Sequence, residues 1–154
     1  MSEVSALLIA VAAAGEMPYG DAATRATERL LEAVPDVTRV QVAHLRSRIR
    51  TRVNVGGSVT ASIRRAVEEA VRTQRVLNIA YADAAGNVTD RAVEACGFYN
   101  GDQGWYLIGW CQLTDAGRIF RIDRIQSARL TTRPVPTRDL DEVLGWVPDE
   151  VATP

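Results

Sequence analysis

The sequence predicts an α+β protein, with an N-terminal helical unit followed by a small antiparallel β-barrel that has one leading helix. Two observations predict it. Apolar residues follow helical spacing in the first part of the chain and alternate with polar residues beyond Gln74, as in strands. The alternating runs are short and separated by turn sequences, an arrangement typical of a small closed barrel without a long free edge.

Helix-forming residues dominate the N-terminal third of the chain. An alanine-rich apolar run from Val4 to Ala14 ends at Gly15, which fits a helix C-terminus. Asp21 opens a second predicted helix, and Pro35-Asp36 begins a third. Because the first helix is apolar nearly all round, we expect it to be buried between elements or against a second copy of the chain.

A linker follows these helices. It is Asn54-Val55-Gly56-Gly57, so residues 1–54 are a predicted helical linker or dimerisation region and residues 58–135 a predicted barrel domain. Before the linker, the arginines between Arg46 and Arg52 alternate with other residues, a strand-like pattern that would place them on one face. After it, Ser58 is a candidate N-cap for the leading helix.

Periodicity predicts the rest of the barrel domain. Between Val59 and Ala70, apolar residues recur at helical spacing, so one stripe of the leading helix packs on a core. The five expected strands are Arg75–Ala82, Val88–Phe98, Gly104–Cys111, Arg118–Ile122 and Ser127–Thr132. The third and fourth are joined as a hairpin by Thr114-Asp115-Ala116-Gly117.

An acidic C-terminal tail, residues 136–154, follows the barrel. It carries a short predicted helix from Asp139 to Leu144. This tail either caps the barrel or meets a partner, and the sequence leaves open whether it competes with a ligand for the arginines.

Composition narrows the class of protein. A chain of 154 residues, 47% of them hydrophobic, buries a core without metals or disulfides, and we expect no cofactor. The formal net charge of −1 argues against a uniformly basic coat. All 18 basic residues are arginine. A GC-rich genome is the simple explanation, yet each guanidinium suits phosphate and aromatic rings.

An enzymatic function is not expected. The one histidine, His44, lies on an apolar helical face where a structural role is expected, and Cys96 and Cys111 lie in apolar strands as reduced thiols. The sequence has no glycine-rich phosphate loop, nucleophile motif or metal-ligand spacing. The apolar N-terminal run is too short to span a membrane, so we expect a cytoplasmic protein without a membrane partner.

The most informative stretch joins an aromatic strand to an arginine-rich one. Gly104–Trp110 carries three aromatic residues, and Arg118–Ile125 carries three arginines. Residues two apart in a strand share a face, so arginines can stand beside aromatic rings, which favours an anionic ligand that bears a ring. Trp105 and Leu107 share one face and Tyr106 lies on the other, and we expect Trp105 in the core.

These residues resemble a known family. Trp105-Tyr106-Leu107, the pattern Arg-x-Phe-Arg-x-Asp-Arg-Ile from Arg118, and a strand ending in Ile79-Ala80-Tyr81 are similar to the WYL domain of bacterial YafY-like transcriptional regulators. The resemblance covers roughly residues 58–135 and implies an Sm-like, SH3-type barrel. In such regulators a winged helix-turn-helix precedes this region. Its signature is missing here, so a fragment and a stand-alone effector module both stay open.

The resemblance also implies a pocket for phosphate and base. Its expected ligand-binding residues are Tyr81, Tyr106, Arg118, Arg121 and Arg124, with Asp123 as the orienting carboxylate. Arg118 and Arg124 share parity along a strand while Arg121 does not, so a bulge or the strand end must bring them together. Two structural alternatives stay open, in which Arg124 pairs with Asp123 or a main-chain carbonyl and Tyr81 packs inside the barrel.

Three functions are compatible with these observations. The first is a ligand-sensing domain of a transcription regulator, in which single-stranded nucleic acid or a nucleotide binds the aromatic and arginine surface and modulates DNA binding by a helix-turn-helix. The second is a structural dimerisation module, in which the N-terminal helices form a homodimer and the arginines only make salt bridges. The third is a sensor of a small anionic metabolite.

Overall fold

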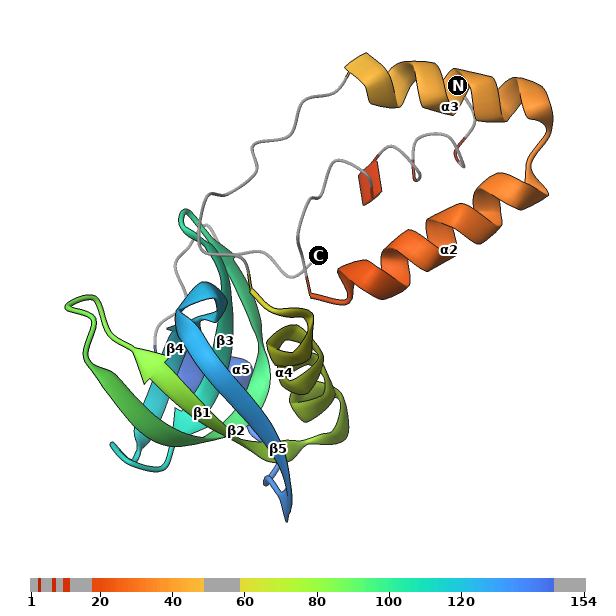
Figure 1. Ribbon diagram of the computed structural model, residues 1–154. Coiled ribbons are helices and arrows are strands. Elements are labelled where there is room, and N and C mark those ends of the chain that lie inside the picture. The colour runs from red at the N-terminus through yellow and green to blue at the C-terminus, as the bar shows by residue number, and fades with distance from the viewer. Residues whose placement is uncertain (1–2, 4–6, 8–9, 12–17, 49–58, 146–154) are drawn as a thin grey trace. The chain divides into compact units, whose positions relative to one another are not determined.

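The computed structural model describes residues 3, 7, 10–11, 18–48 and 59–145 and separates into two compact units, Met1–Asn54 and Val55–Pro154 (Figure 1). Most of the expected helix from Val4 to Ala14 lies outside the described residues. No helix in the described ranges is long and apolar enough to cross a membrane.

The first unit contains two described helices, α2 (Gly20–Ala33) and α3 (Asp36–Arg48). α2 ends just before Pro35 and α3 begins just after it. The carbonyl oxygen of Pro35 accepts hydrogen bonds from the backbone N–H groups of Thr38 and Arg39. The strand-like pattern was expected to begin where the preceding helix ends, and α3 continues to Arg48, so Arg46 and Arg48 are helical. Arginine is a good helix former, so alternation alone did not identify a strand. The remainder of the pattern lies outside the described residues.

The second unit is an α+β domain, as expected. Its elements are α4 (Ala61–Thr73), β1 (Arg75–Ala82), β2 (Val88–Gly101), β3 (Gly104–Cys111), β4 (Ala116–Arg121), the 3₁₀ helix η1 (Ile122–Arg124), β5 (Ile125–Pro134) and α5 (Leu140–Leu144). The expected N-cap Ser58 is wrong, because Thr60 occupies the N-cap position of α4. The short acidic helix follows the N-cap Asp139, whose carboxylate accepts hydrogen bonds from the backbone N–H groups of Asp141 and Glu142.

The five strands form one open antiparallel sheet in the order β4-β3-β2-β1-β5. The expected closure into a barrel is wrong, because no ladder of hydrogen bonds joins the edge strands β4 and β5. These two edge strands are connected in the chain by the short 3₁₀ helix η1.

The sheet is nevertheless strongly rolled. Opposite edges of a flat five-stranded sheet lie about 19 Å apart, whereas the chain from Arg121 to Ile125 reaches at most roughly 14 Å. The ring of Tyr81 in β1 also meets that of Phe120 in β4, with centroids 5.2 Å apart, although two strands separate them in the sheet. The short η1 connection therefore requires a curled sheet.

The core fills the inner face of this curl. Its buried residues are Ile63, Val67, Ala70, Leu77, Ile79, Val93, Ala95, Leu107, Cys111, Phe120, Ile122 and Ile125. Those from α4 lie at helical spacing, so the helix covers the core with its apolar stripe. Trp105 packs against the same core, partly buried, as expected. Both cysteines are free thiols, and only Cys111 is fully buried.

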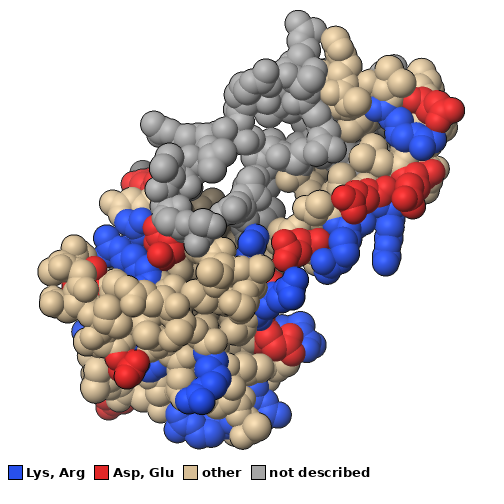
Figure 2. Space-filling model, in the orientation of Figure 1, with Lys and Arg blue, Asp and Glu red and all other residues tan. Residues whose placement is uncertain are grey.

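Charged side chains do not form a continuous basic coat. On the face shown in Figure 2, arginines gather in separate groups, with acidic side chains and neutral surface between them. On this face, binding of an anion would therefore depend on local groups of arginines.

We predict that Leu107→Ala lowers the free energy of unfolding by about 2–5 kcal/mol, because it leaves a cavity in the core. Leu107 is 0% exposed, whereas Leu113 in the β3–β4 turn is 64% exposed and serves as the control. Leu113→Ala should change stability by no more than about 0.5 kcal/mol. Urea unfolding followed by circular dichroism measures both, and equal effects would contradict this core assignment.

Candidate functional site

Two tyrosines and an arginine lie in a row on the outer face of the sheet, opposite the core. The register pairs Tyr99 of β2 with Tyr106 of β3, and Tyr106 with Arg121 of β4. Directly opposed residues share a face, so all three side chains project to one side. The tyrosine rings lie 5.8 Å apart and tilted by 43°. We call Tyr99, Tyr106 and Arg121 the tyrosine–arginine platform.

Gly101 provides the space for the two rings of the platform. A Cβ at this position would lie 2.8 Å from Cε1 of Tyr99 and 3.1 Å from Cε2 of Tyr106. Any larger residue must push at least one ring aside. The turn that follows is only two residues long, because Gly101 pairs with Gly104 across it.

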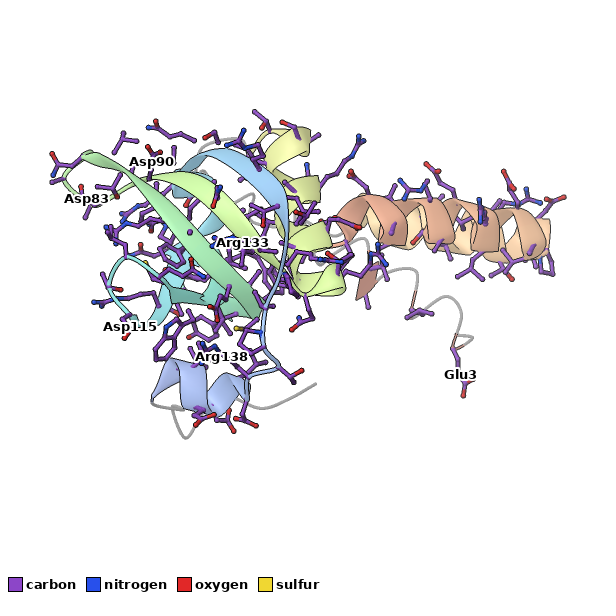
Figure 3. All side chains as sticks on the ribbon, turned by 90° about the horizontal axis from the view of Figure 1, so that it is seen from below. Glu3, Asp83, Asp90, Asp115, Arg133 and Arg138 are labelled. Carbon is purple, nitrogen blue, oxygen red and sulfur yellow. The ribbon has the colours of Figure 1, made fainter. Side chains whose placement is uncertain are left out.

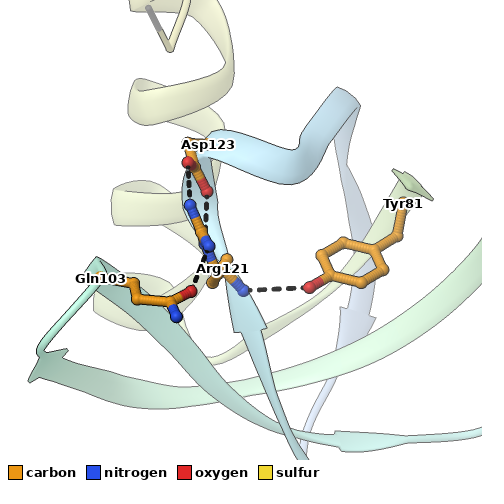
Figure 4. A network of polar contacts seen from close by, with 4 residues as sticks. All are labelled: Tyr81, Gln103, Arg121 and Asp123. Carbon is orange, nitrogen blue, oxygen red and sulfur yellow. Dashed lines mark hydrogen bonds and ion pairs between the residues drawn. The ribbon is translucent and has the colours of Figure 1, made fainter. Parts of the chain in front are cut away.

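Asp123 and Gln103 hold the guanidinium of Arg121 (Figure 4). The Nε and Nη2 groups donate to the two carboxylate oxygens of Asp123 at 3.0 and 2.5 Å, and Nη1 donates to Oε1 of Gln103. The hydrogen bond with Asp123 raises the pKa of Arg121, whose charge is therefore permanent. In the structure, Asp123 lies where an orienting carboxylate would.

Arg121 retains capacity for an anion. A guanidinium carries five N–H donors, and three of those of Arg121 have acceptors among the described residues. Its side chain is 18% exposed. The two remaining N–H groups can therefore donate to a phosphate or carboxylate oxygen while Asp123 keeps the side chain in place.

Tyr81 occupies the inner side of the sheet rather than the platform. Its ring meets Phe120 edge-on, and its hydroxyl oxygen accepts a hydrogen bond from the backbone N–H of Arg121 at 3.3 Å. Both contacts join β1 to β4. Of the two roles considered for Tyr81, the packing role matches these contacts, and its expected stacking on a ligand has no support from its position.

The structure does not bring Arg118 and Arg124 to the platform. The register between β3 and β4 is regular, with Arg118 opposite Gly109, so Arg118 lies on the other face of β4 from Arg121. Arg124 lies in η1. Neither makes an ion pair with a residue in the described part of the chain. The carboxylate of Asp123 is bound by Arg121 instead. The pairing of Arg124 with Asp123, considered above, is wrong.

Sequence reasoning missed two members of this site, Tyr99 and Gln103. The signal was present in the turn Asn100–Gln103. A two-residue hairpin loop fixes the pairing of the residues on either side, and counting outward from it places Tyr99 opposite Tyr106. Gln103 lies in the loop itself and had no sequence signal, because its contact with Arg121 depends on β4.

The outer face next to the platform is covered by α5 (Figure 3). Leu140 lies on Gly97 of β2, with its Cδ2 atom 2.9 Å from where a Cβ would be. The backbone carbonyl oxygen of Val143 lies where a Cβ at Gly117 in β4 would be. These two glycines therefore form the seat of α5, which a side chain at either position would disturb.

The site's chemistry is that of binding. Tyrosine rings offer stacking surfaces and Arg121 offers hydrogen bonds to an anion. Asp123 is engaged by Arg121 through both oxygens, so it is a poor general base. Within the described residues, no three histidine, cysteine or acidic side chains lie close enough together to hold a metal ion.

Comparison with known proteins finds a family similarity within the second unit. Residues 62–130 match the model of the WYL domain. One similar solved structure is proteasome accessory factor B/C (PafBC) of Arthrobacter aurescens, with 27% identity and a TM-score of 0.45; the match covers 86% of this chain and 20% of that one. The chain thus spans about one fifth of that protein's length. No curated protein matches the sequence.

We predict that Tyr81→Phe lowers the free energy of unfolding by about 1–3 kcal/mol, because the backbone N–H of Arg121 loses its acceptor while the ring contact with Phe120 is kept. Tyr99→Phe is the matched control, since the hydroxyl of Tyr99 bonds no described residue, and it should leave stability unchanged. Thermal and urea unfolding measure both. A Tyr81→Phe protein of full stability that has lost ligand binding would place this hydroxyl in the binding site instead.

Proposed function

Since residues 62–130 match the WYL domain, we propose that this chain is the ligand-sensing region of a bacterial transcription regulator, and that single-stranded nucleic acid or a nucleotide binds its tyrosine–arginine platform. In this proposal the bound ligand changes how an attached helix-turn-helix binds DNA. The WYL domain supports the regulatory role, and the platform supports the class of ligand.

The main support for a nucleotide-type ligand is the row formed by Tyr99, Tyr106 and Arg121. Stacking on an aromatic side chain contributes about 1–3 kcal/mol per base and tolerates any base. Beside the rings, Arg121 has two N–H groups for a phosphate oxygen. A nucleotide supplies a ring and an anion at neighbouring positions, so it matches both halves of the platform.

The alternative ligand, a small anionic metabolite, uses Arg121 alone. It is supported by the fixed orientation of the guanidinium, which suits a single carboxylate or phosphate. A metabolite would need neither ring of the platform. Dependence of the affinity on the tyrosines and on oligonucleotide length therefore separates the two ligand classes.

For the ligand to regulate DNA binding, it must bind one conformation of the regulator more tightly than another. Arg121 ends β4 and is followed directly by η1, and its backbone N–H contacts β1 through Tyr81. A ligand on Arg121 therefore acts at the point where the rolled sheet is held together. We propose that this strand end transmits ligand binding to the rest of the regulator.

We predict that Tyr106→Ala weakens binding of a fluorescein-labelled single-stranded DNA oligomer by about 5- to 150-fold, the equivalent of losing one stacked base. Arg121→Lys should weaken it about tenfold, because an ammonium keeps the charge and loses the planar pair of donors. Fluorescence anisotropy at two salt concentrations measures both, and the parent's affinity should fall as salt rises.

Arg118→Lys is the matched control, because Arg118 lies on the other face of β4. Its affinity should equal that of the parent. If Arg118→Lys weakens the affinity for the oligomer as much as Arg121→Lys does, the ligand wraps over the edge of β4. A well-folded parent that binds neither DNA, RNA nor mononucleotides would contradict the proposed ligand class.

A further inference from the structure

The outer face of β3 continues beyond the platform. Tyr106, Ile108 and Trp110 alternate along the strand and project to the same side. Tyr106 and Trp110 are therefore about 13 Å apart along one continuous face. Between them, Ile108 is only 2% exposed although it is not part of the core cluster on the inner face, and α5 packs on β3 and β4. Ile108 is thus covered, whereas Tyr106 on one side of it and Trp110 on the other are each partly exposed.

The covering element is the segment Arg138–Gly145, which we call the cover segment. It includes α5 and the arginine that precedes its N-cap. Leu140 and Val143 seat it on the two glycines described above. Gly97 comes two residues before Tyr99, so the seat of Leu140 directly adjoins the platform.

Arg138 occupies the ring face of Trp110. Its guanidinium carbon lies 4.5 Å from the centroid of the ring. The Nε group donates at 2.8 Å to Oε2 of Glu94, whose other oxygen accepts from Gln112 at 3.2 Å. Trp110 in turn donates through Nε1 to Asp115 at 3.1 Å. The indole is therefore held in place, with a flat cation where a base would stack.

We propose that the cover segment sets the length of ligand that this face accepts. With the segment seated, stacking is confined to Tyr99 and Tyr106, which suits a ligand of one or two bases. With the segment displaced, Trp110 adds a third ring on the same face, which suits a longer strand. Arg138 thus competes with a base for Trp110. This inference rests on the proposed function, since it concerns the same ligand.

The cover segment can leave the face without unfolding the sheet. An α-helix of five residues is too short to be stable alone, so α5 depends on its contacts with the face. Val143 is 4% exposed but is not part of the core cluster, and Leu140 is 39% exposed. The acids Asp141 and Glu142 are exposed in the first turn of α5, so the cover segment carries negative charge that also opposes a long anionic ligand.

The test compares the parent chain with Leu140→Ser/Val143→Ser, which removes the apolar side chains of the cover segment and leaves the residues of the platform unchanged. Oligothymidylates of two, four, eight and twelve nucleotides, each with a fluorescein label, are titrated by anisotropy. We expect the variant to bind the eight- and twelve-nucleotide oligomers at least tenfold more tightly than the parent does, while the dinucleotide affinity stays within twofold.

Leu113→Ser is the control for the loss of a leucine, because Leu113 is exposed in the β3–β4 turn. It should leave every affinity unchanged. Arg138→Gln is a second release variant that retains a donor for Glu94 and removes the cation from Trp110. It should also bind the longer oligomers more tightly than the parent does. This variant tests the same proposal if the double variant fails to fold.

The outcomes separate the two proposals. If the parent binds oligonucleotides and both release variants have its length dependence, the role of the cover segment is overturned and the proposed function stands. If the parent and the variants are folded by circular dichroism and none binds at any length, the proposed function fails and this inference fails with it.

Discussion

The three-residue connection between β4 and β5 is the constraint on which the rest of the second unit depends. Ile122–Arg124 joins strands at opposite edges of the sheet, so the sheet has to roll. Rolling brings Tyr81 of β1 onto Phe120 of β4 and lets its hydroxyl accept the N–H of Arg121. The same connection carries Asp123, which then meets the side chain of Arg121. Fold and site are therefore held by one short segment.

One face of β3 contributes to the core, and the other carries the proposed binding residues. The inner face contributes Leu107 and Cys111 to the core, and the outer face carries Tyr106 and Trp110. Alternation allows this division, because successive side chains project to opposite sides. Glycines in the neighbouring strands then shape the outer face by leaving space where the tyrosine rings and α5 lie.

Asp123 has two opposite effects on the proposed binding of an anion. It fixes the guanidinium of Arg121, so less conformational entropy is lost when a ligand binds. It also cancels part of the positive charge, which weakens long-range attraction of an anion. With separate arginine groups on the visible face, the balance favours recognition by geometry over attraction by charge.

Local patterns in the sequence determined the α+β class, the bounds of β1 and β3, the apolar stripe of α4 and the short acidic helix, because periodicity and capping act within a few residues. Even the pairing of Tyr99 with Tyr106 was encoded in a two-residue turn. Only the tertiary structure decided the open edges, the inward position of Tyr81, the separation of Arg118 from Arg121, and the seat of α5. These features depend on how far the sheet rolls, which brings together residues distant in sequence and leaves no local periodic signal.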